Sequence, residues 1–363
     1  MAIGSFVLEE SPQRVVFGSG TLSRVGDEVR RLDVRRALVL SGGEQKSRTG
    51  EIARLVGSAC AAVFTGVKMH TPVEVTDEAM ALVGRESIDG IVSVGGGSTI
   101  GLGKAIAFRT DLAQVVVPTT YAGSEMTSIL GETTAGTKKT RRDPKILPET
   151  VIYDVDLTLT LPIGLSATSG MNAIAHAVEG LYTRDGNPIL SIMAEEGIRA
   201  LACALPRIAA NPTDRDARTD ALYGAWLCGT VLGRTSMALH HKLCHVLGGG
   251  FNLPHAETHA IVLPHATAYN SSAAPEAMTR VARALAAKDA AGALFDLARR
   301  TGAPTALRDI GMPCDGLDRA ADLAVADPYW NPRSIDRDEI RALLDDAWHG
   351  RRPPVTDSQE GPR

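Results

Sequence analysis

The chain lacks closely spaced cysteines. It has only five, none of them in CxxC spacing, and their odd number leaves at least one without a disulfide partner. They are Cys60, Cys203, Cys228, Cys244 and Cys314. Free thiols in a reducing compartment suit this pattern best, so we expect a cytoplasmic protein.

Long apolar runs are absent too. No stretch approaches the roughly 18 uninterrupted apolar residues of a membrane-spanning helix. Residues 1–14 do not combine a basic start with an apolar segment, as a secretory signal does. We therefore predict neither a membrane span nor a signal segment.

The charged residues form no extended Lys/Arg-rich block. The formal net charge is −4, which argues against nucleic acid or an anionic membrane surface as the main partner. A small molecule is the expected ligand instead.

Internal repeats are not visible, and the one biased segment lies at the end. Residues 351–363 contain three prolines and many polar residues, which predicts a disordered tail. The 363 residues, 44% hydrophobic and 22% charged, describe a globular protein that is long for a single core. Two domains are therefore expected.

What the first half does contain is an alternation of strand and helix patterns. Strands are predicted at 14–18, 36–43, 62–64, 90–94, 114–117 and 150–154, and helices at 19–31, 47–61, 75–86 and 101–108. Such alternation predicts a parallel sheet with helices on both faces. We expect a Rossmann-like α/β domain over residues 1–158, with a polar hairpin or lid over 132–148.

A glycine turn directly follows the fourth predicted strand. Gly95, Gly96 and Gly97 let the backbone approach a pyrophosphate, and the amides at the start of the next helix favour its charge. Ser98 is expected to cap that helix. A glycine-rich turn alone is a weak signal, but its place in the alternating pattern strengthens it. The remaining cofactor-binding candidates are Gly42, Thr119, Thr120, Ser124 and Lys139. The alternative for the hydroxyl-rich loop at 119–127 is an ordinary Ser/Thr turn.

The sequence pattern changes near residues 156–162, and Pro162 and Gly164 mark a predicted domain boundary there. Alanine- and leucine-rich helical patterns follow, which predicts an all-helical domain over 159–350. The predicted helices are 169–182, 188–209, 219–239, 275–285, 290–301, 316–325 and 336–348.

Five of the nine histidines lie within residues 239–259. On a helix His241 and His245 share a face, the glycines at 248–250 are expected to end the helix, and His255 follows a proline. Histidine ionises near neutral pH and is the commonest metal ligand. A solvated polar helix end is the alternative, but leucines and a valine between the histidines indicate partial burial.

The helix at 169–182 carries Asn172 and His176 on one face. With the histidine cluster, it resembles the iron-containing (group III) alcohol dehydrogenases. In that family an aspartate, a histidine four residues later, and two histidines fourteen apart hold a metal. The corresponding residues here are Asn172, His176, His241 and His255.

The amide at Asn172 departs from the family pattern. A divalent metal without the carboxylate loses one unit of attractive charge, on the order of several kcal/mol at an effective dielectric of ~20. We therefore expect no tightly bound metal.

Other segments resemble one branch of the family. They are 70–74, 121–127 and 327–333. That branch reduces the carbon–carbon double bond of maleylacetate (4-oxohex-2-enedioate) to give 3-oxoadipate, in the breakdown of aromatic and chloroaromatic compounds. Its members similarly lack the aspartate and work without metal. The resemblance implies NADH or NADPH as cofactor, a small dicarboxylate substrate and a homodimer. Because no carboxylate follows the strand at 37–40 until Glu44, NADPH is expected to be tolerated beside NADH.

The resemblance also implies roles for the histidines. We assign His241 and His245 as an acid and oxyanion-stabilising pair, with His176, His240 and His255 completing a positive pocket. Asn172 is expected to donate an amide hydrogen bond, and Lys242 and Tyr329 to bind substrate. For His240, His259 and His265 a purely structural role is an equal alternative.

Two further functions compete with this interpretation. One is a metal-dependent alcohol or hydroxyacid dehydrogenase that uses the Asn172 oxygen as a ligand. The other is a non-catalytic nucleotide-binding protein on the same scaffold. A structural role does not require a histidine cluster together with a glycine turn, which argues against the second.

Overall fold

The computed structural model describes Phe6, Leu8 and residues 12–42, 46–69, 71–134 and 137–354. The chain divides into two compact units, and the division falls between Leu161 and Pro162. In the segment predicted to be a disordered tail, residues 351–354 have no regular structure, and 355–363 lie outside the described residues.

The first unit is built on a six-stranded sheet in which every pairing is parallel. The strands are β1 (Arg14–Gly18), β2 (Ala37–Ser41), β3 (Cys60–Phe64), β4 (Gly90–Gly95), β5 (Ala113–Pro118) and β8 (Thr150–Asp154). Their order is β1-β8-β5-β4-β2-β3, so β8 lies inside the sheet between β1 and β5. The predicted Rossmann-like parallel sheet is confirmed.

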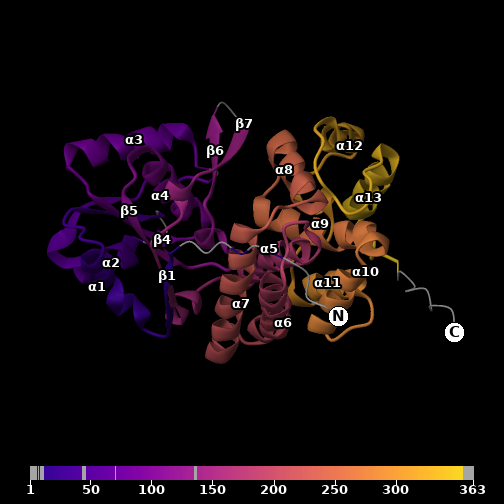
Figure 1. Cartoon of the computed structure of the whole chain (residues 1–363), viewed down its shortest axis with the longest axis horizontal. Coiled ribbons are helices and arrows are strands. Elements are labelled where there is room, and N and C mark those ends of the chain that lie inside the picture. Colours follow the sequence, from indigo (N-terminus) through magenta and orange to yellow (C-terminus); the bar gives the residue numbers. More distant parts are fainter. Residues whose placement is uncertain are drawn as a thin grey trace. The chain divides into compact units, whose positions relative to one another are not determined.

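Helices cover both faces of this sheet (Figure 1). On β2, Ala37 and Val39 pack with α1 (Val25–Arg31) and α2 (Lys46–Val56). Leu38 and Leu40 point the other way, toward α3 (Val73–Arg85) and α4 (Gly97–Thr110). Because successive side chains of a strand face opposite sides, a strand covered on both sides is apolar throughout. All five residues of β2 are buried.

A separate antiparallel hairpin follows β5, where a hairpin or lid was predicted over 132–148, but it begins and ends earlier in the chain. It consists of β6 (Ile129–Thr134) and β7 (Thr137–Arg142), and Ile129 is paired with Arg142. Single turns of 3-10 helix lie at Ser124–Met126 and Pro144–Ile146.

The second unit is helical over its described residues, in agreement with the prediction. Its helices are α5 (Ile163–Tyr182), α6 (Pro188–Ala210), α7 (Arg215–Arg234), α8 (Leu239–Phe251), α9 (His255–Asn270), α10 (Pro275–Ala284), α11 (Ala290–Thr301), α12 (Leu317–Ala326) and α13 (Arg337–His349). α5 is buried along nearly its whole length and packs against α6, α7 and α9. Leu239, Leu243 and Leu247 of α8 lie in a core shared with α9, α12 and α13. The described part of the chain contains no helix able to cross a membrane.

Several predicted boundaries were wrong. α7 ends at Arg234, and Leu239 opens a separate helix. The glycines at 248–250 lie inside α8, which ends one residue later at Phe251, where Asn252 adopts a left-handed conformation with φ 53°. α4 begins at Gly97 rather than at 101, and β3 already begins at Cys60, within the predicted helix 47–61. α9 was not predicted at all.

Candidate active site

The cofactor candidates of the first unit gather where the order of the sheet reverses. From β2 the chain moves to β3 on one side and later to β4 on the other, so the loops after β2 and β4 diverge. Crevices of this kind bind nucleotides at the carboxyl ends of parallel strands. Gly42 follows β2, and Gly96 follows the neighbouring β4.

Two glycines of the predicted turn are required by close packing. A Cβ on Gly95 would lie 2.5 Å from the Thr99 Oγ1, and one on Gly96 would lie 3.0 Å from the Thr120 Cγ2. The Thr119 amide donates to the Gly95 carbonyl at 3.0 Å, which joins the β5 loop to the turn. The first turn of α4, with Gly97 and Ser98, therefore starts directly at the end of β4, where its amides suit an anion.

The predicted cap by Ser98 was wrong. Gly96 occupies the N-cap position of α4, and no side chain caps it. Ser98 lies inside the first turn because the helix begins earlier than expected. It remains a candidate contact for phosphate, since it is only partly buried there.

A buried lysine that the prediction missed supports the β5 loop. Lys104 of α4 is 1% exposed, and its Nζ donates to the carbonyls of Ser124 (2.5 Å), Thr127 (2.7 Å) and Ile129 (3.1 Å). Burial lowers the pKa of Lys104 to about 7, while the neighbouring Glu125 carboxylate raises it. The lysine thus fixes the segment that presents Ser124, whose buried hydroxyl has no hydrogen-bond partner among the described residues.

The remaining cofactor candidates are less constrained. Lys139 lies on β7 opposite Glu132, and its side chain is exposed. Glu44, on which the expected cofactor tolerance depends, lies outside the described residues. At the end of β2, the buried Ser41 hydroxyl bonds to that of Thr49 at 2.5 Å.

In the second unit, three helices bring six histidines together. They are His176 from α5, His240, His241 and His245 from α8, and His255 and His259 from α9. The ring centroids of His241 lie 5.0 Å from His176, 5.1 Å from His240, 5.1 Å from His259 and 6.5 Å from His245. His255 and His259 are 4.3 Å apart. All five predicted catalytic histidines therefore belong to one cluster, in which His245 is exposed and His241 is buried.

A buried carboxylate anchors this cluster. Glu179 of α5, fully buried, accepts a hydrogen bond from the His241 Nδ1 at 2.6 Å. It also accepts from the backbone amides of Ala238 (2.9 Å) and His240 (2.8 Å), and so caps the start of α8. The second nitrogen of His241, Nε2, lies 2.9 Å from the His176 Nδ1. Glu179, His241 and His176 thus form a continuous hydrogen-bonded chain.

The sequence interpretation missed Glu179, although a signal was present. It lies three residues after His176, on the same face of an otherwise apolar helix. An acid in such a helix needs a buried partner.

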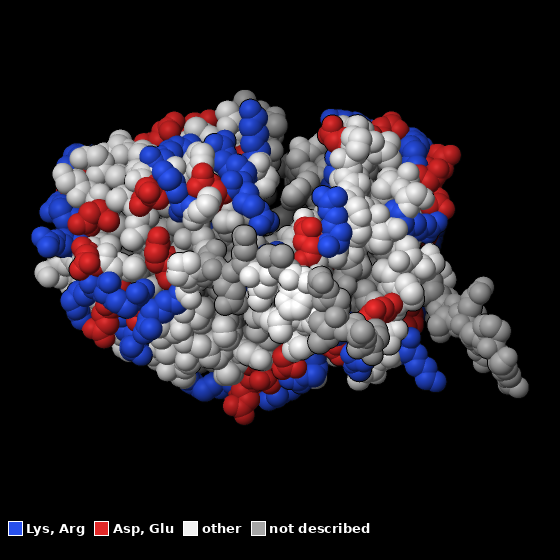
Figure 2. Space-filling model, in the orientation of Figure 1, with Lys and Arg blue, Asp and Glu red and all other residues white. Residues whose placement is uncertain are grey.

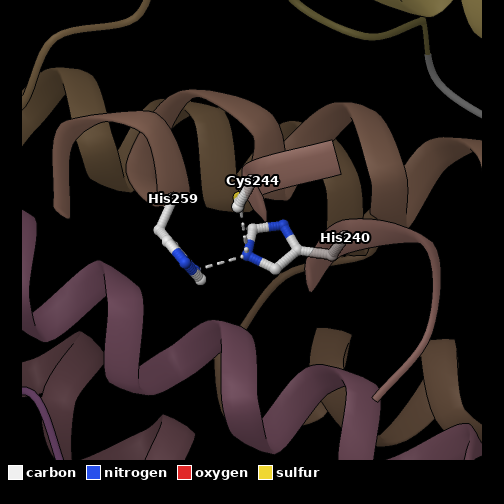
Figure 3. Close-up of side chains that lie close together, drawn as sticks. All are labelled: His240, Cys244 and His259. Carbon is white, nitrogen blue, oxygen red and sulfur yellow. Dashed lines mark hydrogen bonds between the residues drawn. The ribbon is translucent and has the colours of Figure 1, made fainter. Parts of the chain in front are cut away.

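A second imidazole pair lies deeper in the cluster (Figure 3). The His240 Nε2 is 2.9 Å from the His259 Nδ1, and the Cys244 Sγ is 3.7 Å from the same His240 nitrogen. Burial and the neighbouring histidines hold the pKa of His240 and of His259 well below the usual value of 6.5, so both rings are neutral. His240 therefore does not supply the positive charge that was predicted for it. Burial also raises the pKa of the Cys244 thiol.

The predicted substrate-binding residues fall in two places. The Asn172 side chain is buried, and its Oδ1 has no hydrogen-bond partner in the described part of the chain. The Lys242 Nζ lies 5.6 Å from the ring centroid of Tyr329 and 3.7 Å from an Asp327 oxygen. His265 does not join the cluster, since its ring faces Phe295 at 6.5 Å.

Comparison with known proteins shows the family in which a glycine turn of this kind and a histidine cluster of this kind occur in one chain. The model of the iron-containing alcohol dehydrogenases matches residues 12–155, and the model of the C-terminal part of the Fe-containing alcohol dehydrogenase family matches residues 166–348. The chain belongs to the iron-containing alcohol dehydrogenase family. The predicted membership is confirmed.

Several relatives that are 52–54% identical to this chain are maleylacetate reductases. Maleylacetate reductase from Burkholderia cepacia is 54% identical over 97% of this chain and 100% of its own length. The solved maleylacetate reductase structures from Agrobacterium tumefaciens and Rhizobium sp. strain MTP-10005 are each 54% identical, with TM-scores of 0.93 and 0.92. They cover 97% and 96% of this chain, which covers 100% and 99% of theirs. A 1,3-propanediol oxidoreductase is 27% identical, with a TM-score of 0.87, over 96% of this chain and 100% of its own.

Proposed function

We propose that this enzyme reduces the carbon–carbon double bond of maleylacetate with NADH or NADPH and forms 3-oxoadipate. The observation that carries the proposal is the 54% identity, over nearly the full length of both chains, to proteins named maleylacetate reductase. The histidine cluster supports it, because it supplies the acid groups that this reduction needs.

The reaction has two parts that balance. A hydride leaves the reduced nicotinamide and bonds to the alkene carbon β to the ketone, which breaks the carbon–carbon π bond and yields an enolate and the oxidised cofactor. A proton then bonds to the other alkene carbon, which lies next to the ketone, and the enolate becomes a ketone again. Negative charge develops on the ketone oxygen in the first part, so hydrogen-bond donors already aimed at that oxygen lower the barrier.

We assign that donor role to His241 and His245. For His241 the substrate oxygen must take the place of the His176 Nδ1 at its Nε2, because its Nδ1 is bound by Glu179. Glu179 holds the His241 Nδ1 at 2.6 Å, which fixes the tautomer and stabilises an imidazolium. His245 is exposed beside it and exchanges protons with solvent. His176 continues the hydrogen-bonded chain from the His241 Nε2 and serves as a proton reserve. The cationic forms of these rings attract a dicarboxylate.

The residues at the metal position of the family do not fit a tightly held divalent cation. Asn172 offers a neutral amide oxygen, and the other three positions offer imidazoles, so the set has no anionic ligand. The buried acid of the cluster, Glu179, is hydrogen-bonded to His241 and to two backbone amides. We therefore propose that the reduction is metal-independent.

The decisive experiment measures NADH consumption with maleylacetate, with 3-oxoadipate identified as the product. Turnover should persist after treatment with a strong chelator. No turnover of maleylacetate by folded enzyme, with either NADH or NADPH, would refute the proposed function.

One observation favours a second function, that of a metal-dependent alcohol or hydroxyacid dehydrogenase. The buried Asn172 Oδ1 has no hydrogen-bond partner among the described residues, and a cation would satisfy it. Metal dependence of the activity separates the two functions: activity that is lost with the bound iron or zinc on chelation, and restored when that metal is added back, supports the second. Asn172→Asp is the matched variant, because it restores the carboxylate and should increase bound metal under either function.

We also propose a homodimer in the cytoplasm. The dimer rests on the family resemblance, and light scattering coupled to size-exclusion chromatography tests it. The location is supported by the cysteines, all five of which are free.

A further inference from the structure

We propose that His240, Cys244 and His259 form a buried binding site for a divalent thiophilic cation such as Zn²⁺. The site shares no residue with the four positions at which the family holds its metal. It also does not depend on the proposed reaction.

The three side chains converge because of helix geometry. His240 and Cys244 are four residues apart on α8 and so lie on one face, and His259 reaches the same place from α9 (Figure 3). Their ligand atoms all lie within 4.8 Å of one another. His240 and His259 are 0% exposed and Cys244 is 1% exposed.

The separations suit tetrahedral coordination. With Zn–N bonds of about 2.0 Å and Zn–S bonds of about 2.3 Å, ligand atoms of one ion lie roughly 3.3–3.6 Å apart. The present values are 2.9 Å between the two imidazole nitrogens and 3.7 Å between sulfur and nitrogen. The third separation, between the Cys244 Sγ and the His259 nitrogen, is within 4.8 Å, so side-chain shifts of up to about 1 Å place an ion between the three atoms.

The donor types distinguish this site from the family position. Two neutral imidazoles and a thiolate form a soft set that prefers Zn²⁺ to Mg²⁺ or Ca²⁺. On binding, the cation forms two nitrogen bonds and one sulfur bond, the thiol proton leaves to solvent, and the hydrogen bond between His240 and His259 breaks. The thiolate supplies the negative charge that Asn172 does not. A fourth coordination position stays open for water or a neighbouring side chain.

Cobalt absorption tests the site directly. Co²⁺ takes the same ligands as Zn²⁺, and a thiolate bound to it gives a charge-transfer band in the near ultraviolet, which imidazole and amide ligands do not give. Chelator-treated full-length enzyme should develop this band up to one equivalent of Co²⁺, and Zn²⁺ should abolish it by displacement.

Matched variants locate the ligands. Cys244→Ala and His259→Asn should each remove the band, whereas Cys228→Ser should keep it, since Cys228 is a buried cysteine of α7 outside the cluster. Asn172→Ala should also keep it, which separates this site from the family position. Absence of the band in wild-type enzyme, or its survival in Cys244→Ala, would overturn the proposal.

A measurement without variants covers the case in which Cys244→Ala does not fold. X-ray absorption at the zinc edge of the wild-type complex should show one sulfur at about 2.3 Å with nitrogen at about 2.0 Å. A shell of nitrogen and oxygen alone would contradict the assignment.

Discussion

At the scale of single residues, Glu179 combines two tasks in one carboxylate. One oxygen holds His241, and the group also accepts two backbone amides at the start of α8. An amide in its place keeps one acceptor for the backbone but loses the negative charge that stabilises an imidazolium. The variant Glu179→Gln therefore removes the charge together with one of the two backbone hydrogen bonds, and its folding is verified separately.

We predict that Glu179→Gln lowers kcat about 100-fold, because His241 loses its carboxylate partner. Steady-state kinetics across pH, with circular dichroism to verify folding, measure this. Tyr182→Phe is the control. It removes a long hydrogen bond of 3.3 Å from the Tyr182 hydroxyl to Glu179, and it should change kcat little. A folded Glu179→Gln enzyme with wild-type kcat at every pH contradicts the role.

His265 makes a prediction about stability. Burial lowers the pKa of His265 from 6.5 to about 4, so between these values the unfolded chain binds a proton that the folded chain does not. The free energy of unfolding therefore falls as pH drops from about 6.5 toward 4. The expected contribution is up to about 1.4 kcal/mol per pH unit for this histidine.

His265→Leu should remove that contribution, because the variant has no group to titrate there. Urea unfolding at several pH values measures the slope in both proteins, and the variant should show the shallower fall. Parallel slopes would mean that His265 does not titrate as its burial implies. His240 and His259, buried as well, leave part of the fall in place.

At the scale of elements, α4 stabilises the loop after β5 through Lys104. We predict that Lys104→Met destabilises the protein by about 2–4 kcal/mol and raises KM for NADH on the order of tenfold, because three carbonyls lose their donor. Thermal unfolding and initial rates measure the two effects. Lys145→Met, at an exposed lysine, is the control. An unchanged KM for NADH in the folded variant would show that this loop does not take part in cofactor binding.

Most elements could be predicted because their patterns are strong. The buried strands β2 and β4 are mostly apolar, with Gly42 after the first and Gly95 at the end of the second. The helices α10 and α13 each have an apolar face and a charged face. α9 was not predicted because three histidines and an internal proline, Pro264, hide its helical period, and most of its residues are buried. A helix that is buried all round has no polar face to reveal its period.

The glycines of α8 show tertiary packing overriding local preference. Each glycine costs a helix about 1 kcal/mol relative to alanine, which is why residues 248–250 were expected to end it. Leu247 before them is fully buried, and Phe251 after them packs on the same core, so the helix continues between these two anchors.

The candidate site also has a part that could be predicted from the sequence and a part that could not. The five predicted catalytic histidines do lie in one cluster, because their spacing on α8 and their places on α5 and α9 follow from the helical period. The partners of Glu179 are backbone amides 59 and 61 residues away, and no local pattern announces them.

At the scale of the whole molecule, the surface carries both charges in mixture. In the view of Figure 2, Lys and Arg are interspersed with Asp and Glu over the described surface, in keeping with the net charge of −4. This distribution accords with the prediction that nucleic acid is not a partner, which stays a prediction.

The choice between NADH and NADPH depends on the residues at the carboxyl ends of the assembled strands. We predict that NADH and NADPH are both used, with values of kcat/KM that differ by less than about a thousandfold, or roughly 4 kcal/mol. The reason is that β2 ends in hydroxyl and glycine residues, where an acid would repel a 2′-phosphate. Parallel titrations with both cofactors measure the ratio. A larger preference for either one would show that a residue elsewhere selects it.

The position of β1 at the edge of the sheet has a consequence for synthesis. Its partner is β8, and Arg14 pairs with Thr150. The other four strands of the sheet lie between these two residues in the sequence. Such distant pairing slows folding, because a long loop must close before the contacts form. On the ribosome, β1 emerges first and remains without its neighbour until β8 has left the exit tunnel. The α/β unit thus completes its sheet only when the helical unit is already being made.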